Sequence, residues 1–345
     1  MPKTYNDRWE TIKALGEGGQ AHTYLVKDLL GKGEIHYVLK RLKNINRIDR
    51  FIDEIEAIRN LNHINILNLI DFNLDGDKPY FVSEYCSGGS LDKVEPFWEN
   101  SPQLALNIFQ EVCQGLILAH SEKIIHRDIK PSNIFLRTQK GPAVIGDFGL
   151  VFNIDDGTRV TLTNEAVGAI NFMAPELEDG KFDNISDKVD VYSMGKFLYW
   201  LLSKGKMFSR EKHRDIAFDL RSRNEDSILN LGWDNIYMEH INRILDLMIL
   251  VDPNMRRDIK NISILIKRAT RLIHKEFTPV GKNEPQPCTY CGYGKYVFKV
   301  NNNQQVRNFG FTPIGGSDWR VLVCNECGHT QAFRVDYANK KSWWS

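Results

Sequence analysis

The sequence predicts an α+β fold class with three parts: a β-rich N-terminal part, a larger helical part and a small β-type unit near the C-terminus. Three observations lead to this prediction. Apolar and polar residues alternate over residues 9–45, as they do in half-buried strands. From residue 101 onward, apolar residues recur mostly with the period of a helix. Two Cys-x₂-Cys pairs then follow a proline-rich stretch.

The composition is that of an ordinary globular protein, with 42% hydrophobic and 26% charged residues in a chain of 345. The formal net charge of +1 gives no overall field that would attract nucleic acid or an acidic membrane. The sequence shows neither a secretory signal nor an apolar run of membrane-spanning length. We therefore expect no membrane span and a cytoplasmic location, where disulfides are rare.

The N-terminal part should contain five strands and one helix. The strand-like runs are WETIKALG, HTYLVKD and HYVLKRL, then ILNLIDFNL and YFVSEYC on either side of the turn DGDKP. Residues 49–61 change period, because five apolar side chains fall on one helical face: Phe51, Ile52, Ile55, Ile58 and Leu61.

The next part should be mainly helical, with helices at about 101–121, 188–204, 236–250 and 258–275. The first begins with Ser-Pro, residues that favour the N-cap and first-turn positions. Residues 276–287 are rich in proline and polar residues and are predicted to be a linker. Beyond the linker, the runs YVFKV, RVLVC and QAFRVD are strand-like.

A charged loop, IIHRDIKPSNIFL at residues 124–136, carries a His, an Arg, an Asp, a Lys and an Asn between apolar ends. Its centre, HRDIKPSN, resembles the catalytic loop H-R-D-x-K-x-x-N of the eukaryotic-type (Hanks-type) serine/threonine protein kinases. Other motifs of that family occur upstream and downstream in the family's order: LGEGGQAHTYLV, YVLK, YFVSEYCSGGSL, VIGDFGL, MAPE, DVYSMG and DPNMRR. Each motif alone is weak, but the ordered set is specific.

The resemblance covers about residues 9–272 and implies the two-lobed protein-kinase fold. We therefore place a kinase domain at 1–275, with a β-rich N-lobe at about 1–86 and a helical C-lobe at about 87–275. Asp190 resembles the family's buried aspartate that braces the catalytic loop, and Arg256 is positioned to pair with Glu176.

The resemblance also implies ATP and Mg²⁺ (or Mn²⁺) as cofactors. The expected nucleotide-binding positions are Gly16, Gly18, Gly19, Lys40, Glu84, Cys86, Asn133 and Asp147. Glycines let backbone amides approach phosphates, and backbone groups of Glu84 and Cys86 would contact adenine. Asn133 and Asp147 offer Mg²⁺ the oxygen ligands that it prefers. Ser83, just before Glu84, is either a small residue that opens a pocket behind adenine or a tolerated strand residue.

Catalytic roles are expected for Asp128, Lys130, Lys40 and Glu54. Phosphoryl transfer depends on positioning and charge neutralisation more than on covalent chemistry. Asp128 would accept the proton of the substrate hydroxyl, and Lys130 would offset charge on the γ-phosphoryl group. Lys40 would orient the phosphates and pair with Glu54 on the following helix, with Glu56 as the alternative partner.

These motifs imply an ATP/Mg-dependent kinase that transfers the γ-phosphate to Ser/Thr hydroxyls of a protein substrate. Lys130, two residues after Asp128, is typical of serine/threonine kinases, whereas Ala169 stands where the family usually has Thr. Two alternatives stay open: a nucleotide-binding pseudokinase scaffold acting through the C-terminal unit, and a small-molecule kinase. The intact catalytic residues disfavour the first, and the MAPE segment with Arg256 disfavours the second.

Four cysteines lie in the two C-terminal pairs: Cys288, Cys291, Cys324 and Cys327. Their spacing predicts a zinc ribbon over residues 288–345, in which four thiolates bind one Zn²⁺; disulfides are the alternative. Basic and aromatic residues in this unit suit single-stranded nucleic acid. They also suit a small aromatic core or a protein contact, which we favour.

Arg127 beside Asp128 is typical of kinases in which this arginine binds an activation-loop phosphate. The loop at 147–176 offers three threonines: Thr158, Thr161 and Thr163. We predict autophosphorylation at one of them, measured by mass spectrometry after incubation with ATP and Mg²⁺. An unmodified 150–175 peptide from active enzyme would contradict this, and would mean that the threonines merely suit an exposed loop.

Overall fold

The computed structural model describes residues 3–17, 21–31, 33–148, 171–177, 185–206, 238–273, 288, 296–300, 319–325 and 330–334. The chain divides into two compact units. The first comprises residues 1–234 and 242–264, and the second comprises 235–241 and 265–345. No helix in the described ranges combines the length and apolar character that crossing a membrane requires.

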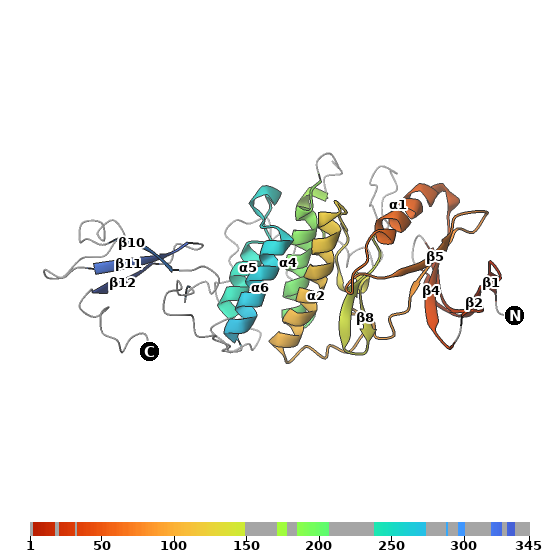
Figure 1. The fold of residues 1–345 in the computed structure, drawn as a ribbon, viewed down its shortest axis with the longest axis horizontal. Coiled ribbons are helices and arrows are strands. Elements are labelled where there is room, and N and C mark those ends of the chain that lie inside the picture. The colour runs from red at the N-terminus through yellow and green to blue at the C-terminus, as the bar shows by residue number, and fades with distance from the viewer. Residues whose placement is uncertain are drawn as a thin grey trace. The chain divides into compact units, whose positions relative to one another are not determined.

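Six antiparallel strands form the N-terminal sheet, in the order β1-β2-β3-β4-β6-β5 (Figure 1). They are β1 (Thr4–Tyr5), β2 (Trp9–Glu17), β3 (Ala21–Asp28), β4 (His36–Leu42), β5 (Leu69–Asn73) and β6 (Tyr80–Glu84). Five of them agree to within one residue with the runs that the sequence predicts, or lie inside those runs. The additional strand β1 has two residues, which is too few to show any alternation. Because β1 precedes the predicted strands, the strand that carries Lys40 is the fourth in the chain, β4.

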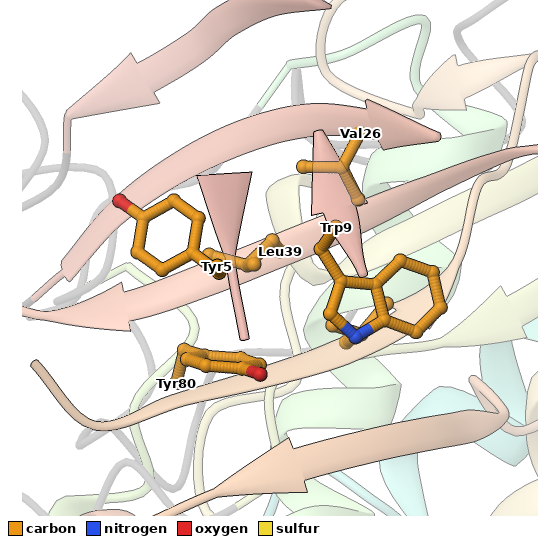
Figure 2. Close-up of a cluster of buried hydrophobic side chains, with 6 residues drawn as sticks. Tyr5, Trp9, Val26, Leu39 and Tyr80 are labelled. Atoms are coloured by element: carbon orange, nitrogen blue, oxygen red, sulfur yellow. The ribbon is translucent and has the colours of Figure 1, made fainter. Parts of the chain in front are cut away.

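Both faces of this sheet are apolar. One face carries an aromatic-rich cluster, most of which Figure 2 labels: Tyr5, Trp9, Val26, Leu39, Tyr80 and Val82. The opposite face packs on helix α1 (Ile48–Arg59) through Leu42, Phe51, Ile55 and Phe81. Because successive strand residues point to opposite faces, Phe81 lies under α1 while its two neighbours belong to the other cluster. This packing fixes α1 against the strand that carries Lys40.

Four longer helices follow: α2 (Pro102–Ser121), α4 (Lys188–Leu202), α5 (Met238–Asp246) and α6 (Ile259–Ile273). Helix α2 begins as predicted, since Ser101 Oγ accepts a hydrogen bond from Leu104 N at 3.3 Å. Helix α4 packs against α2 and is buried along most of its length. Short 3₁₀ turns occur at Ile45–Arg47, Pro131–Asn133, Pro175–Leu177 and Pro253–Met255.

A small antiparallel sheet inside the helical part was not predicted. It consists of β7 (Gly89–Ser90), β8 (Ile134–Thr138) and β9 (Gly141–Ile145), in that order. Strands β8 and β9 form most of the segment that joins the predicted catalytic loop to Asp147. The sheet therefore sets the spacing between these two groups of functional residues.

The described residues of the second unit include three antiparallel strands, β10 (Tyr296–Val300), β11 (Trp319–Cys324) and β12 (Thr330–Arg334), in that order. All three lie within or beside the predicted strand-like runs. Cys288 and Cys324 are buried, and Cys324 is opposite Tyr296 in the β10–β11 register. Cys291 and Cys327 lie outside the described residues.

Candidate active site

Lys40 lies between two carboxylates. Its Nζ is 2.7 Å from Glu54 Oε1 and 2.8 Å from Asp147 Oδ1. Glu54 is buried on α1, whereas Glu56, two residues further on, is exposed. Phe81 is opposite Lys40 in the β4–β6 register, and its ring centroid is 5.5 Å from Nζ. Three elements thus meet at one ammonium group: β4, α1 and the segment after β9.

The shared ammonium sets the charge state of both carboxyls. Burial favours a lower pKa for Lys40, but Asp147 and Glu54 outweigh it and raise that pKa above its ordinary value. Burial favours a higher pKa for Asp147, yet the contact with Lys40 lowers it. For Glu54 the burial effect prevails over Lys40 and raises the pKa to about 7. Glu54 is therefore the carboxyl of the pair that takes up a proton first.

Asp128 and Asn133 are joined within the catalytic loop. Asn133 Nδ2 donates to Asp128 Oδ2 and to its backbone oxygen, both at 2.8 Å. Lys130 Nζ also lies 2.8 Å from Asp128 Oδ2. Because the amide nitrogen of Asn133 makes these contacts, its amide oxygen keeps the role of acceptor or metal ligand. The donor set therefore fits Mg²⁺, with Asn133 Oδ1 and the Asp147 carboxylate as oxygen ligands.

Asp190, on α4, holds the backbone of the catalytic loop. Its carboxylate accepts hydrogen bonds from His126 N at 2.8 Å and Arg127 N at 2.7 Å. His120 Nε2, at the end of α2, lies 2.8 Å from the same group. Burial would raise the pKa of Asp190, but the contacts with His120 and His126 lower it. A fully buried carboxylate thus remains charged because all its neighbours here are donors.

The catalytic loop is also bonded to the segment that carries Asp147. His126 Nε2 donates to Gly146 O at 2.8 Å, and Gly146 N donates to Asn133 O at 2.9 Å. Arg127 and Asp147 both have positive φ, +65° and +54°, which is unfavourable for residues other than glycine. The contacts of Arg127 with Asp190 and of Asp147 with Lys40 stabilise these two conformations.

The predicted adenine-binding residues lie at the end of β6, which is Glu84, and just after it. Glu84 N donates to Asn68 O at 3.1 Å, so the carbonyl of Glu84 is the group that remains for a nucleotide base. Cys86 is buried, and burial raises the pKa of its thiol to about 12, which keeps the thiol protonated. Ser83 is buried in β6, opposite Val38 of β4. Its small side chain stays consistent with either of the two predicted roles.

Several predicted residues lie outside the described ranges: Gly18, Gly19, Thr158, Thr161, Thr163, Ala169, Cys291 and Cys327. Gly16 is described near the end of β2, where a Cβ would meet no atom within 4 Å. Further from the loop, Arg256 binds Glu176 through two contacts, of 2.5 Å and 2.8 Å. The predicted pairing of these two residues is therefore present in the structure.

Arg137 is a residue of this region that the sequence did not single out. Its guanidinium binds both carboxylate oxygens of Glu84, at 2.7 Å and 2.8 Å. The two residues are 53 positions apart, and no family motif includes Arg137. Strand prediction for residues 134–138 could have placed it beside the segment after β6, but the pairing itself has no local sequence signal.

Comparison with known proteins identifies the family. The family model for the protein kinase domain matches residues 9–267. The chain belongs to the protein kinase family. This confirms the family predicted from the catalytic-loop motif and its partners, and it agrees with the predicted class of serine/threonine kinase. Residues 288–345, where the sequence predicts the zinc ribbon, lie beyond this match.

Two curated kinases illustrate the relationship. Serine/threonine-protein kinase PknB of Mycobacterium leprae is 32% identical over 225 residues, which is 63% of this chain and 36% of that protein. PrkC of Bacillus subtilis, also a serine/threonine-protein kinase, is 28% identical over 288 residues, 80% of this chain and 43% of that protein. The kinase chain thus spans less than half the length of these relatives.

A solved structure shows the same fold. The crystal structure of Rad53 1-466 in complex with AMP-PNP matches with a TM-score of 0.57 and 25% identity. The match covers 74% of this chain and 64% of that one. The expected protein-kinase fold is therefore confirmed for the first part of the chain.

The pKa of Glu54 predicts a pH-dependent stability. The folded chain keeps this proton up to about pH 7, whereas the ordinary value is 4.5, so the folded state binds more protons between these limits. The contribution of Glu54 to the free energy of unfolding therefore falls as the pH rises from 4.5 to about 7. Without nucleotide or Mg²⁺, Glu54→Gln should gain about 1–3 kcal/mol relative to the original chain between pH 5 and pH 8 in urea denaturation.

The matched control is Glu56→Gln, which alters an exposed glutamate on the same helix. Its stability relative to the original chain should not change with pH. If the curves for Glu54→Gln and the original chain stay parallel from pH 5 to pH 8, the raised pKa of Glu54 is wrong.

Proposed function

We propose that the chain is an ATP- and Mg²⁺-dependent protein kinase that phosphorylates serine and threonine hydroxyls of proteins. The main support is the position of Lys40 between Glu54 and Asp147. These are the residues that the family uses to hold phosphates and metal. Membership of the family and the names of its relatives support the same activity.

The residues present fit the nucleotide and metal. Mg-ATP would supply the γ-phosphoryl group, with Asn133 and Asp147 as metal ligands and Lys40 at the phosphates. Glu54 keeps the Lys40 ammonium in place at 2.7 Å and is itself held by the packing of α1. The protein would thus contribute charged groups that are already in position before the reaction. Such groups stabilise a transition state in which negative charge is dispersed over the phosphoryl oxygens.

Asp128 is placed to act on the acceptor hydroxyl. Both side-chain contacts, from Asn133 and Lys130, use its Oδ2. Within the described residues, Oδ1 is therefore the oxygen left to accept the hydrogen bond and the proton of a serine or threonine hydroxyl. Lys130, close to the same carboxylate, would place positive charge beside the transferred group.

Removing the Asp128 carboxylate should abolish transfer while sparing nucleotide binding. In a γ-³²P transfer assay on a Ser/Thr peptide library, Asp128→Ala should lower kcat by roughly 10²–10⁴-fold. Its affinity for AMP-PNP should stay within about twofold, because Asp128 acts on the acceptor. Asp77→Ala, in an exposed turn, is the control and should behave like the original chain.

The assay also separates the proposed activity from its alternatives. An original chain that binds AMP-PNP but transfers no phosphate to any peptide or to itself would be a pseudokinase scaffold. Transfer to small molecules but not to peptides would indicate a small-molecule kinase.

We further propose that the C-terminal unit is a zinc ribbon that recruits or senses a partner, with a protein partner favoured over nucleic acid. Support comes from the spacing of the four cysteines and from the burial of Cys288 and of Cys324, which is the last residue of β11. A unit this small has little core, so metal binding would contribute to its folding. A cytoplasmic location belongs to the same proposal, because thiolates stay reduced there.

The zinc proposal predicts about one Zn²⁺ per chain by elemental analysis of the purified full-length protein. Cys324→Ser should lower that content severalfold, because a structural site needs all four ligands. Cys113→Ala, in helix α2, should keep it. A metal-free protein in which all four C-terminal cysteines are oxidised to disulfides would instead support the alternative.

A further inference from the structure

Arg137 reaches two separate parts of the kinase domain with one side chain. From β8, its guanidinium forms a fork with Glu84, with Nε donating to Oε2 at 2.8 Å and Nη2 to Oε1 at 2.7 Å. Nη1 donates to Ile64 O, and Nη2 also lies 3.5 Å from Ile66 O. Planar, bidentate contacts of this kind fix direction as well as charge.

Glu84 is in turn fixed to the loop between α1 and β5. Its Oε1 accepts a hydrogen bond from Asn68 N at 2.9 Å, and its own N donates to Asn68 O at 3.1 Å. The side chains of Glu84 and Arg137 are each less than a quarter exposed. Partial burial strengthens the pair relative to a surface salt bridge, which contributes little. The carboxylate is therefore held by donors from two different elements.

The backbone of Arg137 holds the residues after Glu84. Its carbonyl accepts from Ser87 N at 3.2 Å and from Ser87 Oγ at 3.0 Å. Gly88 N donates to Leu136 O at 3.0 Å. This approach is so close that a Cβ on Gly88 would lie 2.0 Å from Thr138 O, so only glycine fits. Hydrogen bonds of Glu84, Ser87 and Gly88 thus hold residues 84–88 against β8.

We propose that Arg137 is a positioning residue for the adenine end of the nucleotide. It acts through Glu84, whose carboxylate accepts hydrogen bonds from Arg137 and Asn68. These bonds fix the backbone groups of Glu84 and Cys86 that are expected to contact the base. A pre-positioned backbone binds the base without first losing conformational freedom. The inference rests on the proposed nucleotide-binding function, and it assigns Arg137 no contact with ATP itself.

The test compares a ligand that contains adenosine with one that consists of phosphates alone. AMP-PNP carries adenosine, whereas tripolyphosphate carries phosphates alone, for which Lys40 is the expected cation. With Mg²⁺ and the full chain, calorimetry should show Arg137→Met binding AMP-PNP about three- to tenfold more weakly. Binding of tripolyphosphate should be unchanged. KM for ATP should rise by the same factor, with kcat within about twofold.

Two further variants separate positioning from general damage. Arg137→Lys keeps the charge but loses the fork, so its affinity for AMP-PNP should lie between those of the original chain and Arg137→Met. This variant also serves if the methionine variant does not fold. Arg8→Met breaks another bidentate pair, with Asp28 of the N-terminal sheet, and should leave AMP-PNP affinity unchanged.

The outcomes are distinct. An original chain that fails to bind AMP-PNP would overturn the proposed function itself. An original chain that binds AMP-PNP, with folded variants at Arg137 that bind it equally well, would overturn the role of Arg137 alone. Equal losses for AMP-PNP and tripolyphosphate, together with a lowered Tm, would also overturn it, because a merely structural defect acts on both ligands.

Discussion

One ammonium group shared by two carboxylates is the interaction on which the candidate site depends. Lys40 comes from a strand, Glu54 from a helix and Asp147 from the segment after a second sheet, and none of them is a neighbour of another in the sequence. A partly buried cation must be neutralised, and the Asp147 carboxylate suffices for that; Glu54, whose pKa burial raises to about 7, adds surplus negative charge as the pH rises through that value. The surplus negative charge suits a site built for a further cation, which is how the family uses Mg²⁺.

The catalytic loop depends on a second buried charge. Asp190 has no solvent exposure, and it organises two consecutive backbone amides and one histidine. These donors fix the unfavourable backbone of Arg127 and hence the direction of Asp128, the next residue. The direction of the loop carboxylate that performs the proposed proton transfer is thus set by a second carboxylate, on helix α4. Catalytic geometry in this chain follows from buried electrostatics more than from local loop preference.

The sequence predicted features whose cause is local or motif-based. The period of residues 49–61 located α1, and the HRD loop with its ordered partners located the kinase domain and the pair Lys40–Glu54. It missed β1 because two residues carry no period, and it missed β8 and β9 because short strands beside a motif resemble a loop. The Arg137–Glu84 contact was missed because it forms only when the folded chain brings β8 next to the end of β6. The whole zinc site remains a prediction, and two of its four cysteines, Cys291 and Cys327, lie outside the described residues.

The aromatic cluster on the outer face of the N-terminal sheet bears on where the domain begins. The family match starts at residue 9, yet Tyr5 is buried and its ring centroid lies 5.5 Å from that of Tyr80. Arg8 forms salt bridges with Asp28 and Asp71, and Trp9 Nε1 donates a hydrogen bond to Asp71 Oδ2 at 2.7 Å. A chain shortened to the family boundary would uncover Tyr80 and leave β2 as a bare sheet edge, open to pairing with another molecule. Expression of an isolated kinase domain should therefore begin no later than residue 3.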